Sequence, residues 1–372
     1  MEETKTILQT SHRLRYALII EGFLVGGCAG IISIIYRQLL SYAEQWVQWL
    51  SAMMRQSLTW VVLGFALLLL IGFGISLLLR HEQLISGSGI PQIEAEVGGQ
   101  LEENWLRVLW SKMAAGVLAA LGGLSLGREG PSIQLGGMCG KGFGQLFHRV
   151  KIEQRYLITC GAAAGLSAAF NAPLAGIMFA LEELHRSFSM SVIVSVMIAS
   201  VTGDFLSQYV FGLAPAFHFD VAQTLPLHLY LIVVLLGILC GVMAACYNFI
   251  TLKAQDWYAR IPFLKPSQHV FIPLLVSGIL MLILPQVLGS GHSMSEELAF
   301  GERIPHVLLF LLLAKFAFST LSFGSGAAGG IFFPMLVLGS YLGAAFGSAL
   351  SETGLFDPRF VNNFIIMGMA GL

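Results

Sequence analysis

Long apolar runs dominate this chain, and short polar connections separate them. A membrane-spanning helix needs about 20 mainly apolar residues. We predict such a helix in each of seven runs: 17–36, 58–79, 105–126, 189–211, 227–250, 269–288 and 305–323. Their apolar residues are continuous and lack the alternation that is typical of β-barrel strands. The pattern therefore predicts an all-α polytopic membrane protein.

Shorter apolar pieces, broken by glycine, lie between these runs: 131–147, 156–170, 172–181 and 330–350. A short helix at membrane depth is tolerated only where its ends are buried in protein or line a wet cavity. We therefore expect broken helices around an internal site. No polar region is large enough for a separate domain. We predict a cytoplasmic N-terminal segment, 1–16, whose basic residues fit the positive-inside rule, and one membrane domain, 17–372.

Composition excludes several classes of protein. Charged residues make up 11% of the chain, against roughly 25% in soluble domains. This deficit argues against a soluble enzyme, a disordered chain and a nucleic-acid binder, and the net charge of -1 creates no field for polyanions. The five cysteines lie in apolar stretches and form no CxxC, and the histidines are scattered, so we expect neither disulfides nor a metal site.

The chain contains an internal repeat at an offset of 203 residues. A lysine pair, Lys112 and Lys315, is matched in register by seven further pairs: Gly127/Gly330, Pro131/Pro334, Leu135/Leu338, Gly136/Gly339, Gly140/Gly343, Phe143/Phe346 and Gly144/Gly347. Chance apolar similarity does not readily supply lysine, proline and glycine pairs together. We place repeat 1 at about 17–211 and repeat 2 at about 227–372. Repeated halves are typical of transporters, whose sites lie at the repeat interface.

Three glycine-rich segments carry the candidate chemistry: 87–91 (GSGIP), 127–131 (GREGP) and 330–334 (GIFFP). Each places glycine before a helix start and proline in the first turn, where proline is tolerated. The free N–H groups of such a helix start form an anion site that needs no cationic side chain. One segment alone is better explained as a simple helix break. Three together, two of them related by the repeat, favour an anion site inside the bilayer.

These segments, in this order, resemble the signature segments of the CLC family of chloride channels and proton-coupled chloride transporters. The similarity runs from about Arg15 to Leu372, includes GAAAGLSAAFNAPLAGIMFALEE, and is greatest to the bacterial exchanger branch. It implies a CLC-like inverted repeat of broken helices that forms a homodimer in the lipid bilayer, with one ion pathway per subunit. The bacterial inner membrane is the implied location.

The resemblance also implies an anion site. Ser88 would give its hydroxyl to a bound chloride ion, and Ile331 and Phe332 would give backbone N–H groups. Gly127, Arg128 and Gly130, around the gating glutamate, are further candidates for anion binding.

A site tyrosine would come from the family's last helices. We expect it beyond Leu372, because repeat 1 runs on past GAAAGL whereas repeat 2 stops at the equivalent GMAGL, so that the C-terminal helices are missing.

Two glutamates are the candidate proton carriers. Glu129, within GREGP, resembles the family's gating glutamate, and an ionisable side chain at membrane depth is a functional candidate by default. The alternative is a structural helix cap paired with Arg128. Glu183 resembles the inner glutamate that takes protons from the cytoplasm in the exchangers, while true channels lack it. Its alternative is an interfacial role, since Glu182 is adjacent.

Lys112 lies inside an apolar run and needs a partner. Glu94 or Glu96, just after GSGIP, could neutralise it and fix the Ser88 segment. The other possibility is that Lys112 snorkels to the membrane surface.

We predict proton-coupled chloride exchange, with bound chloride ions and no cofactor. The alternative is a passive, voltage- or pH-gated chloride channel on the same fold, which Glu183 argues against. A fluoride-selective relative is disfavoured because Ser88 fits the chloride type. An intramembrane enzyme is remote, because the chain has neither HExxH nor paired aspartates.

Overall fold

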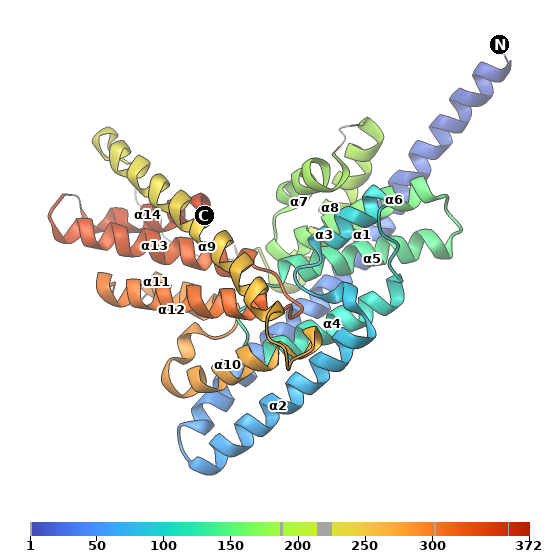
Figure 1. The fold of residues 1–372 in the computed structure, drawn as a ribbon. Helices are drawn as coiled ribbons and strands as arrows, with labels where there is room; N and C mark the ends of the chain where they lie inside the picture. The colour runs from blue at the N-terminus through green and yellow to red at the C-terminus, as the bar shows by residue number, and fades with distance from the viewer. Residues whose placement is uncertain (1, 187–188, 214–224, 301–302, 356) are drawn as a thin grey trace. The chain divides into compact units, whose positions relative to one another are not determined.

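The computed structural model describes residues 2–186, 189–213, 225–300, 303–355 and 357–372, with side chains described from residue 18 except at positions 191, 296, 299 and 300. Within these ranges the chain forms helices and turns and no β-strand (Figure 1). The α-helices are α1 (Glu2–Met54), α2 (Leu58–His81), α3 (Ile90–Gly98), α4 (Trp105–Leu121), α5 (Glu129–Leu146), α6 (Lys151–Phe170), α7 (Pro173–Phe179), α8 (Met190–Phe211), α9 (Tyr230–Ala259), α10 (Phe271–Ile283), α11 (His292–Phe300), α12 (Pro305–Gly324), α13 (Phe332–Glu352) and α14 (Val361–Gly371).

Shorter helical turns connect some of these elements. They are the 3-10 turns η1 (Gln83–Ile85), η3 (Leu227–Leu229), η4 (Pro266–Gln268), η5 (Pro285–Val287) and η6 (Pro358–Phe360), and the π-helical segment η2 (Ala180–His185).

The all-helical prediction is confirmed, with two differences in the spans. Seven described helical segments are long and apolar enough to cross a membrane, and six of them correspond to predicted spans. The predicted span at 105–126 is the one without a counterpart among these segments. Helix α4 covers only 17 residues of it, because Gly122 and Gly123 follow the helix and Gly123 adopts a left-handed φ of 69°. In its place α13, predicted as a shorter piece, qualifies with 21 residues.

Two compact units make up the chain. Unit 1 comprises Met1–Ser41, His81–Val117 and Arg128–Ala216, and unit 2 comprises Tyr42–Arg80, Leu118–Gly127 and Phe217–Leu372. The units follow the sequence repeats except that unit 2 also contains the end of α1, α2 up to Arg80, and the segment Leu118–Gly127, which includes the end of α4. Helix α1 is also longer than the predicted run 17–36, because it continues without a break to Met54.

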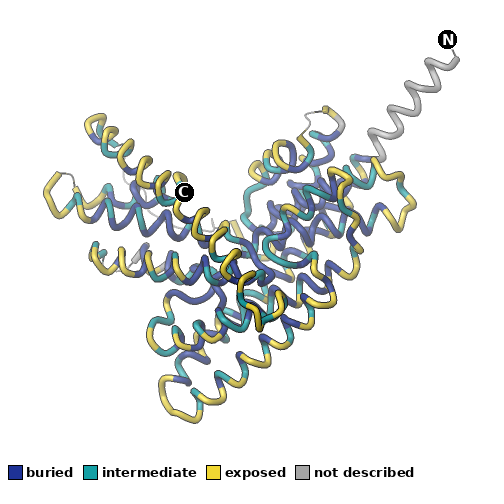
Figure 2. Tube along the Cα trace, viewed as in Figure 1, coloured by how far each residue is buried: buried dark blue, intermediate teal, exposed yellow. Residues whose placement is uncertain are grey.

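Glycine packing holds unit 1 together around α5 and α6, both of which are largely buried (Figure 2). A Cβ added to Gly136 would lie 2.2 Å from the carbonyl oxygen of Gly161, and one on Gly140 would lie 2.0 Å from that of Leu157. The two backbones are therefore in direct contact. Small residues permit this close approach, which supplies van der Waals energy where the hydrophobic effect between helices is weak.

The same packing recurs in unit 2 between α13 and α14. A Cβ on Gly339 would lie 2.3 Å from the carbonyl oxygen of Gly368, and one on Gly343 would lie 2.2 Å from that of Phe364. Gly339 and Gly343 are the repeat partners of Gly136 and Gly140, so the register read from the sequence corresponds to an equivalent packing of helices in the two units.

We expect Gly161→Leu to destabilise the protein by about 3 kcal/mol, the upper end of the usual cost of overpacking a core. The side chain would have to displace the α5 backbone, because a Cβ at this position already lies 2.1 Å from the carbonyl oxygen of Gly136. Thermal unfolding in detergent measures the effect. Gly27→Leu is the matched control, since nothing lies within 4 Å of a Cβ there. Equal destabilisation by the two substitutions would contradict the packing.

Candidate functional site

The Ser88 loop, residues 86–89, lies between η1 and α3 in unit 1. Gly87 and Gly89 adopt left-handed φ angles of 67° and 93°, which a residue with a Cβ rarely does. The Ser88 hydroxyl oxygen accepts the N–H of Ile90 at 3.3 Å. No described residue accepts the Ser88 hydroxyl proton in return. The loop therefore presents one hydroxyl donor beside the start of a helix.

Lys112 fixes this loop, but not in the way that the sequence predicted. The side chain is fully buried, so it does not snorkel to the surface. Its ammonium group donates to the carbonyl oxygens of Ile85 at 2.8 Å and Gly87 at 2.7 Å. Backbone carbonyls therefore take the role expected of Glu94 or Glu96, and the loop is held directly.

The predicted carboxylate partners of Lys112 bind other cations. Glu94 forms an ion pair with Arg186, at the end of the π-helical segment, and Glu96 forms a buried ion pair with Lys141 at 2.5 Å. These pairings correct the sequence prediction. Carbonyl acceptors satisfied Lys112, which left both glutamates available for basic residues that the sequence analysis did not consider.

Glu129 begins α5, also in unit 1, and is only 2% exposed. Arg128 approaches it, with Nε 4.0 Å from the carboxylate Oε1, so the ion pair of the alternative, structural interpretation is present. The next residue packs on the Ser88 loop, because a Cβ on Gly130 would lie 2.8 Å from the Cβ of Ser88. Glu129 and Ser88 are thus on adjoining segments, next to the positive ends of two helix dipoles.

Tyr36, on α1, is a neighbour of Glu129 that the sequence analysis missed. Its ring is 1% exposed, its phenol interacts electrostatically with the Glu129 carboxylate, and its hydroxyl packs on Gly116, where a Cβ would lie 2.2 Å away. A tyrosine within an apolar helix is usually a core residue, so the sequence carried no signal for this placement.

Ile331 and Phe332 lie at the start of α13 in unit 2, with Ile331 as the capping residue. Their N–H groups are at the positive end of the helix dipole. Just before them, Gly330 exchanges two backbone hydrogen bonds of 2.7 Å with its repeat partner Gly127, also in unit 2. These residues have the geometry of an anion-binding helix start. Their assembly with Ser88 and Glu129 into one site stays a prediction.

Unit 2 contains a counterpart of the Ser88 loop. Lys315, the repeat partner of Lys112, is fully buried and donates to the carbonyl oxygens of Val287 at 3.0 Å and Gly289 at 2.7 Å. The loop reads Gly-Ser-Gly again, and its Ser290 hydroxyl donates to Glu44 Oε1 at 2.6 Å. The two serines therefore differ in one respect: the Ser290 hydroxyl proton already has an acceptor.

Glu183 and Glu182 lie in the π-helical segment of unit 1 and are both exposed. Neither forms an ion pair with a residue that the structure describes. π-Helical turns are rare and are frequently found at functional sites. Both carboxylates are therefore in contact with solvent, from which either could take up a proton, and the structure does not distinguish their roles.

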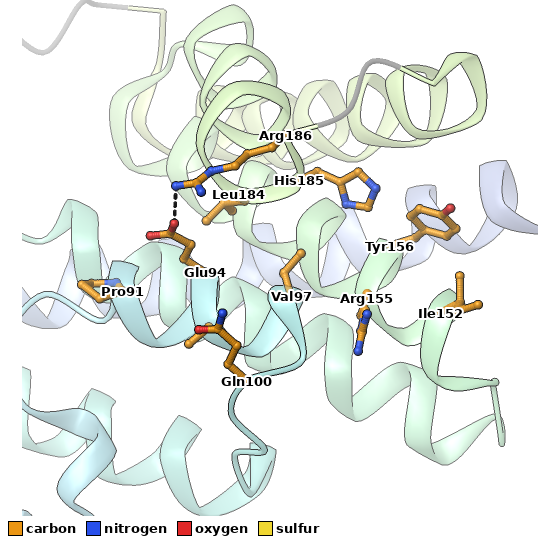
Figure 3. Close-up of a pocket in the computed structure, with 12 residues that line it drawn as sticks. Pro91, Glu94, Val97, Gln100, Ile152, Arg155, Tyr156, Leu184, His185 and Arg186 are labelled. Atoms are coloured by element: carbon orange, nitrogen blue, oxygen red, sulfur yellow. Dashed lines mark hydrogen bonds and ion pairs between the residues drawn. The ribbon is translucent and has the colours of Figure 1, made fainter.

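A cavity of about 580 Å³ adjoins the end of this segment. Figure 3 shows residues that line it, among them the ion pair of Glu94 with Arg186 and the neighbouring rings of His185 and Tyr156. Burial lowers the pKa of His185, so this imidazole is mainly neutral at pH 7. The cavity gives water access to the helix that carries Glu183.

One pentapeptide, 123–127 (GLSLG), has the G-x-S-x-G spacing of a hydrolase nucleophile elbow. In that motif the serine sits on a turn between a strand and a helix, with its hydroxyl exposed. Ser125 instead follows a helix and is 1% exposed, and its backbone N–H donates to the Ser322 hydroxyl. The match therefore gives no support to an enzyme site.

Known proteins are similar to this chain in sequence and in fold. The voltage gated chloride channel family matches residues 71–372. The H(+)/Cl(-) exchange transporter ClcA of Citrobacter koseri is 35% identical, over 96% of this chain and 77% of the relative. The ClcA protein of Vibrio cholerae (strain ATCC 39541) is 34% identical, over 89% and 73% of the two chains.

Two solved structures resemble the described fold. A slow cyanobacterial Cl-/H+ antiporter aligns with a TM-score of 0.86 and 30% identity, covering 95% of this chain and 84% of its own. A CLC-type fluoride/proton antiporter aligns with a TM-score of 0.75 at 21% identity, over 96% and 87%, which shows the shared fold alone. With its seven candidate spans and these relatives, the chain is a multi-pass membrane protein.

Proposed function

Because the chain belongs to the voltage gated chloride channel family, we propose that it exchanges chloride for protons across a membrane. The observation that carries this proposal is the contact of the Ser88 loop with Gly130, next to the buried Glu129. A hydroxyl that can donate a hydrogen bond to an anion and an ionisable carboxylate are thus adjacent at two helix starts. Relatives that are about 35% identical are named H(+)/Cl(-) exchange transporters.

In the proposed mechanism, chloride is bound by the Ser88 hydroxyl and by the N–H groups of Ile331 and Phe332. Gly127, Arg128 and Gly130 line the approach. The Glu129 carboxylate competes with chloride for a neighbouring helix start, because an anion and a carboxylate seek the same donors. A proton neutralises this carboxylate, which then leaves the anion position. One residue therefore couples the two ions.

Glu183 is the proposed inner proton carrier. It is exposed, and the cavity beside its π-helical segment provides water from which a proton can be taken. A passive chloride channel needs no such residue, so Glu183 favours exchange over the channel alternative. We assign the chain a transport function with bound chloride and no cofactor or enzymatic reaction. A homodimer in the bacterial inner membrane is the proposed assembly and location.

The test is chloride accumulation in liposomes that contain the purified chain. An outward proton gradient, alkaline outside and acidic inside, should drive radiolabelled chloride into the lumen against its own gradient as protons leave. A channel would only let chloride follow the membrane potential. Chloride that never exceeds the level set by the potential would reject exchange in favour of the channel alternative.

Ser88→Pro should raise the preference for nitrate over chloride. Chloride is compact and strongly hydrated, so it depends more on a hydroxyl donor than nitrate does. Reversal potentials in mixed salts measure the change. The matched control is Ser290→Ala in the second Gly-Ser-Gly loop, whose hydroxyl is occupied by Glu44 and which should leave selectivity unchanged. Equal selectivity in Ser88→Pro and the parent would remove Ser88 from the anion site.

A further inference from the structure

Four buried polar side chains form a cluster behind the Ser88 loop in unit 1. Glu96 is on α3, Gln134 and Lys141 are on α5, and Glu103 is in the connection between α3 and α4. None of them is more than 7% exposed. The proposed transport mechanism uses none of these residues.

The charges of this cluster do not balance. Lys141 Nζ donates to Glu96 Oε1 at 2.5 Å and to the Glu103 carbonyl at 2.6 Å, while Glu96 Oε2 accepts the Glu103 N–H at 2.6 Å. The Glu96 carboxylate is therefore paired with the Lys141 ammonium group and accepts a second hydrogen bond from the Glu103 N–H. The Glu103 carboxylate has one side-chain donor, Gln134 Nε2 at 3.3 Å, and its Oε1 has no partner among the described residues. A second buried cation, Lys112, donates its hydrogen bonds to the backbone carbonyls of Ile85 and Gly87, at the Ser88 loop.

A buried carboxylate without its own cation favours the protonated form, because the charged form is poorly solvated. Burial raises the pKa of Glu103 to about 7. The Gln134 hydrogen bond lowers it, the Glu96 charge raises it, and the charges of Lys141 and Lys112 lower it. These are the charged and titratable groups that face Glu103. A cavity of about 290 Å³, lined in part by Glu96 and Lys141, brings water to the cluster.

Gln134 links Glu103 to the Ser88 loop. Its Nε2 also donates to the carbonyl of Leu84 at 3.0 Å, in the turn that leads into the loop. The side chain lies against the loop itself, because a Cβ on Gly89 would be 2.3 Å from Gln134 Oε1. One amide group therefore serves both the loop and the surplus carboxylate.

We propose that Glu103 is a proton-binding residue that regulates the anion site, with protonation of Glu103 strengthening chloride binding at the Ser88 loop. This rests on the proposed role of Ser88 in chloride binding. The ionised carboxylate weakens binding in two ways: its charge repels the anion, and it draws the Gln134 amide away from Leu84. Both effects have the same sign, so chloride affinity falls as Glu103 loses its proton.

Calorimetric titration of the purified chain with chloride tests this in a Glu129→Gln background, which removes the titration of the gate. Chloride affinity should fall as pH rises through about 7, on the order of fivefold, as expected for one added negative charge screened by an effective dielectric of about 20. Adding Glu103→Gln should abolish this pH dependence and retain the tighter affinity. Adding Glu102→Gln instead, an exposed neighbour, should leave the dependence intact. A dependence that survives Glu103→Gln would overturn the proposal.

Thermal unfolding provides a second readout that separates the two proposals. The raised pKa means that folded Glu103 binds its proton more tightly than the unfolded chain does, so its stabilisation is lost as pH rises from about 4.5 to about 7. Glu103→Gln should therefore become more stable than its parent over that interval and stay so above it. If the stability of Glu103→Gln and that of its parent changed with pH in parallel, the Glu103 proposal alone would be overturned. Chloride affinity that Ser88→Pro leaves unchanged would overturn the proposed anion site, and with it the regulatory link.

Discussion

Glu129→Ala should abolish proton movement driven by chloride while leaving a chloride conductance. The substitution removes the proposed proton-carrying carboxylate at the start of α5, but the helix N–H groups and the Ser88 hydroxyl that we propose to hold the anion stay in place. It also removes the carboxylate that we propose to compete with chloride, so chloride should continue to flow without gating by Glu129. Parallel recordings of chloride and pH from the same liposomes measure both fluxes.

The matched control is Glu102→Ala, which removes an exposed carboxylate from the same unit. Both fluxes should then stay coupled as in the parent chain. If Glu129→Ala still moved protons in response to chloride, Glu129 would be a structural residue paired with Arg128, which is the alternative that the sequence left open.

Glu183→Gln should also uncouple the two ions, because it removes the proposed inner proton carrier. Glutamine keeps the size of the side chain but cannot accept a proton at neutral pH, so chloride should still flow while proton transport stops. The same paired recording checks this. Glu182→Gln is a close control, because both residues are exposed on one π-helical segment. Normal coupling in Glu183→Gln together with lost coupling in Glu182→Gln would transfer the inner proton role to Glu182.

The sequence predicted most of the fold because its signals are local. A run of apolar residues predicts a membrane helix by itself. Paired glycines at a constant offset predicted the repeat, and the structure gives these glycines equivalent close contacts in α5 and α13. The errors also have local causes. Gly122 and Gly123 ended α4 early, and no helix-breaking residue stopped α1 at residue 36, so that it ran on to Met54.

Partners within the candidate site could not be predicted in the same way. Buried Lys112 plainly needed acceptors, but backbone carbonyls have no signature in the sequence, and the nearby Glu94 and Glu96 were the visible choice. Tyr36 and Gln134 come next to Glu129 and the Ser88 loop through tertiary packing, from positions that read as ordinary helix residues. Such contacts depend on how helices pack, which hydropathy does not specify.

Proton uptake driven by a chloride gradient alone tests the account most directly. Liposomes loaded with chloride and containing the purified chain would be diluted into chloride-free medium at equal pH, with the external pH recorded. We predict that protons enter as chloride leaves, that uptake persists against an opposing proton gradient, and that it is absent from empty liposomes. Chloride efflux with no proton movement would contradict exchange, and would make the chain a passive chloride channel.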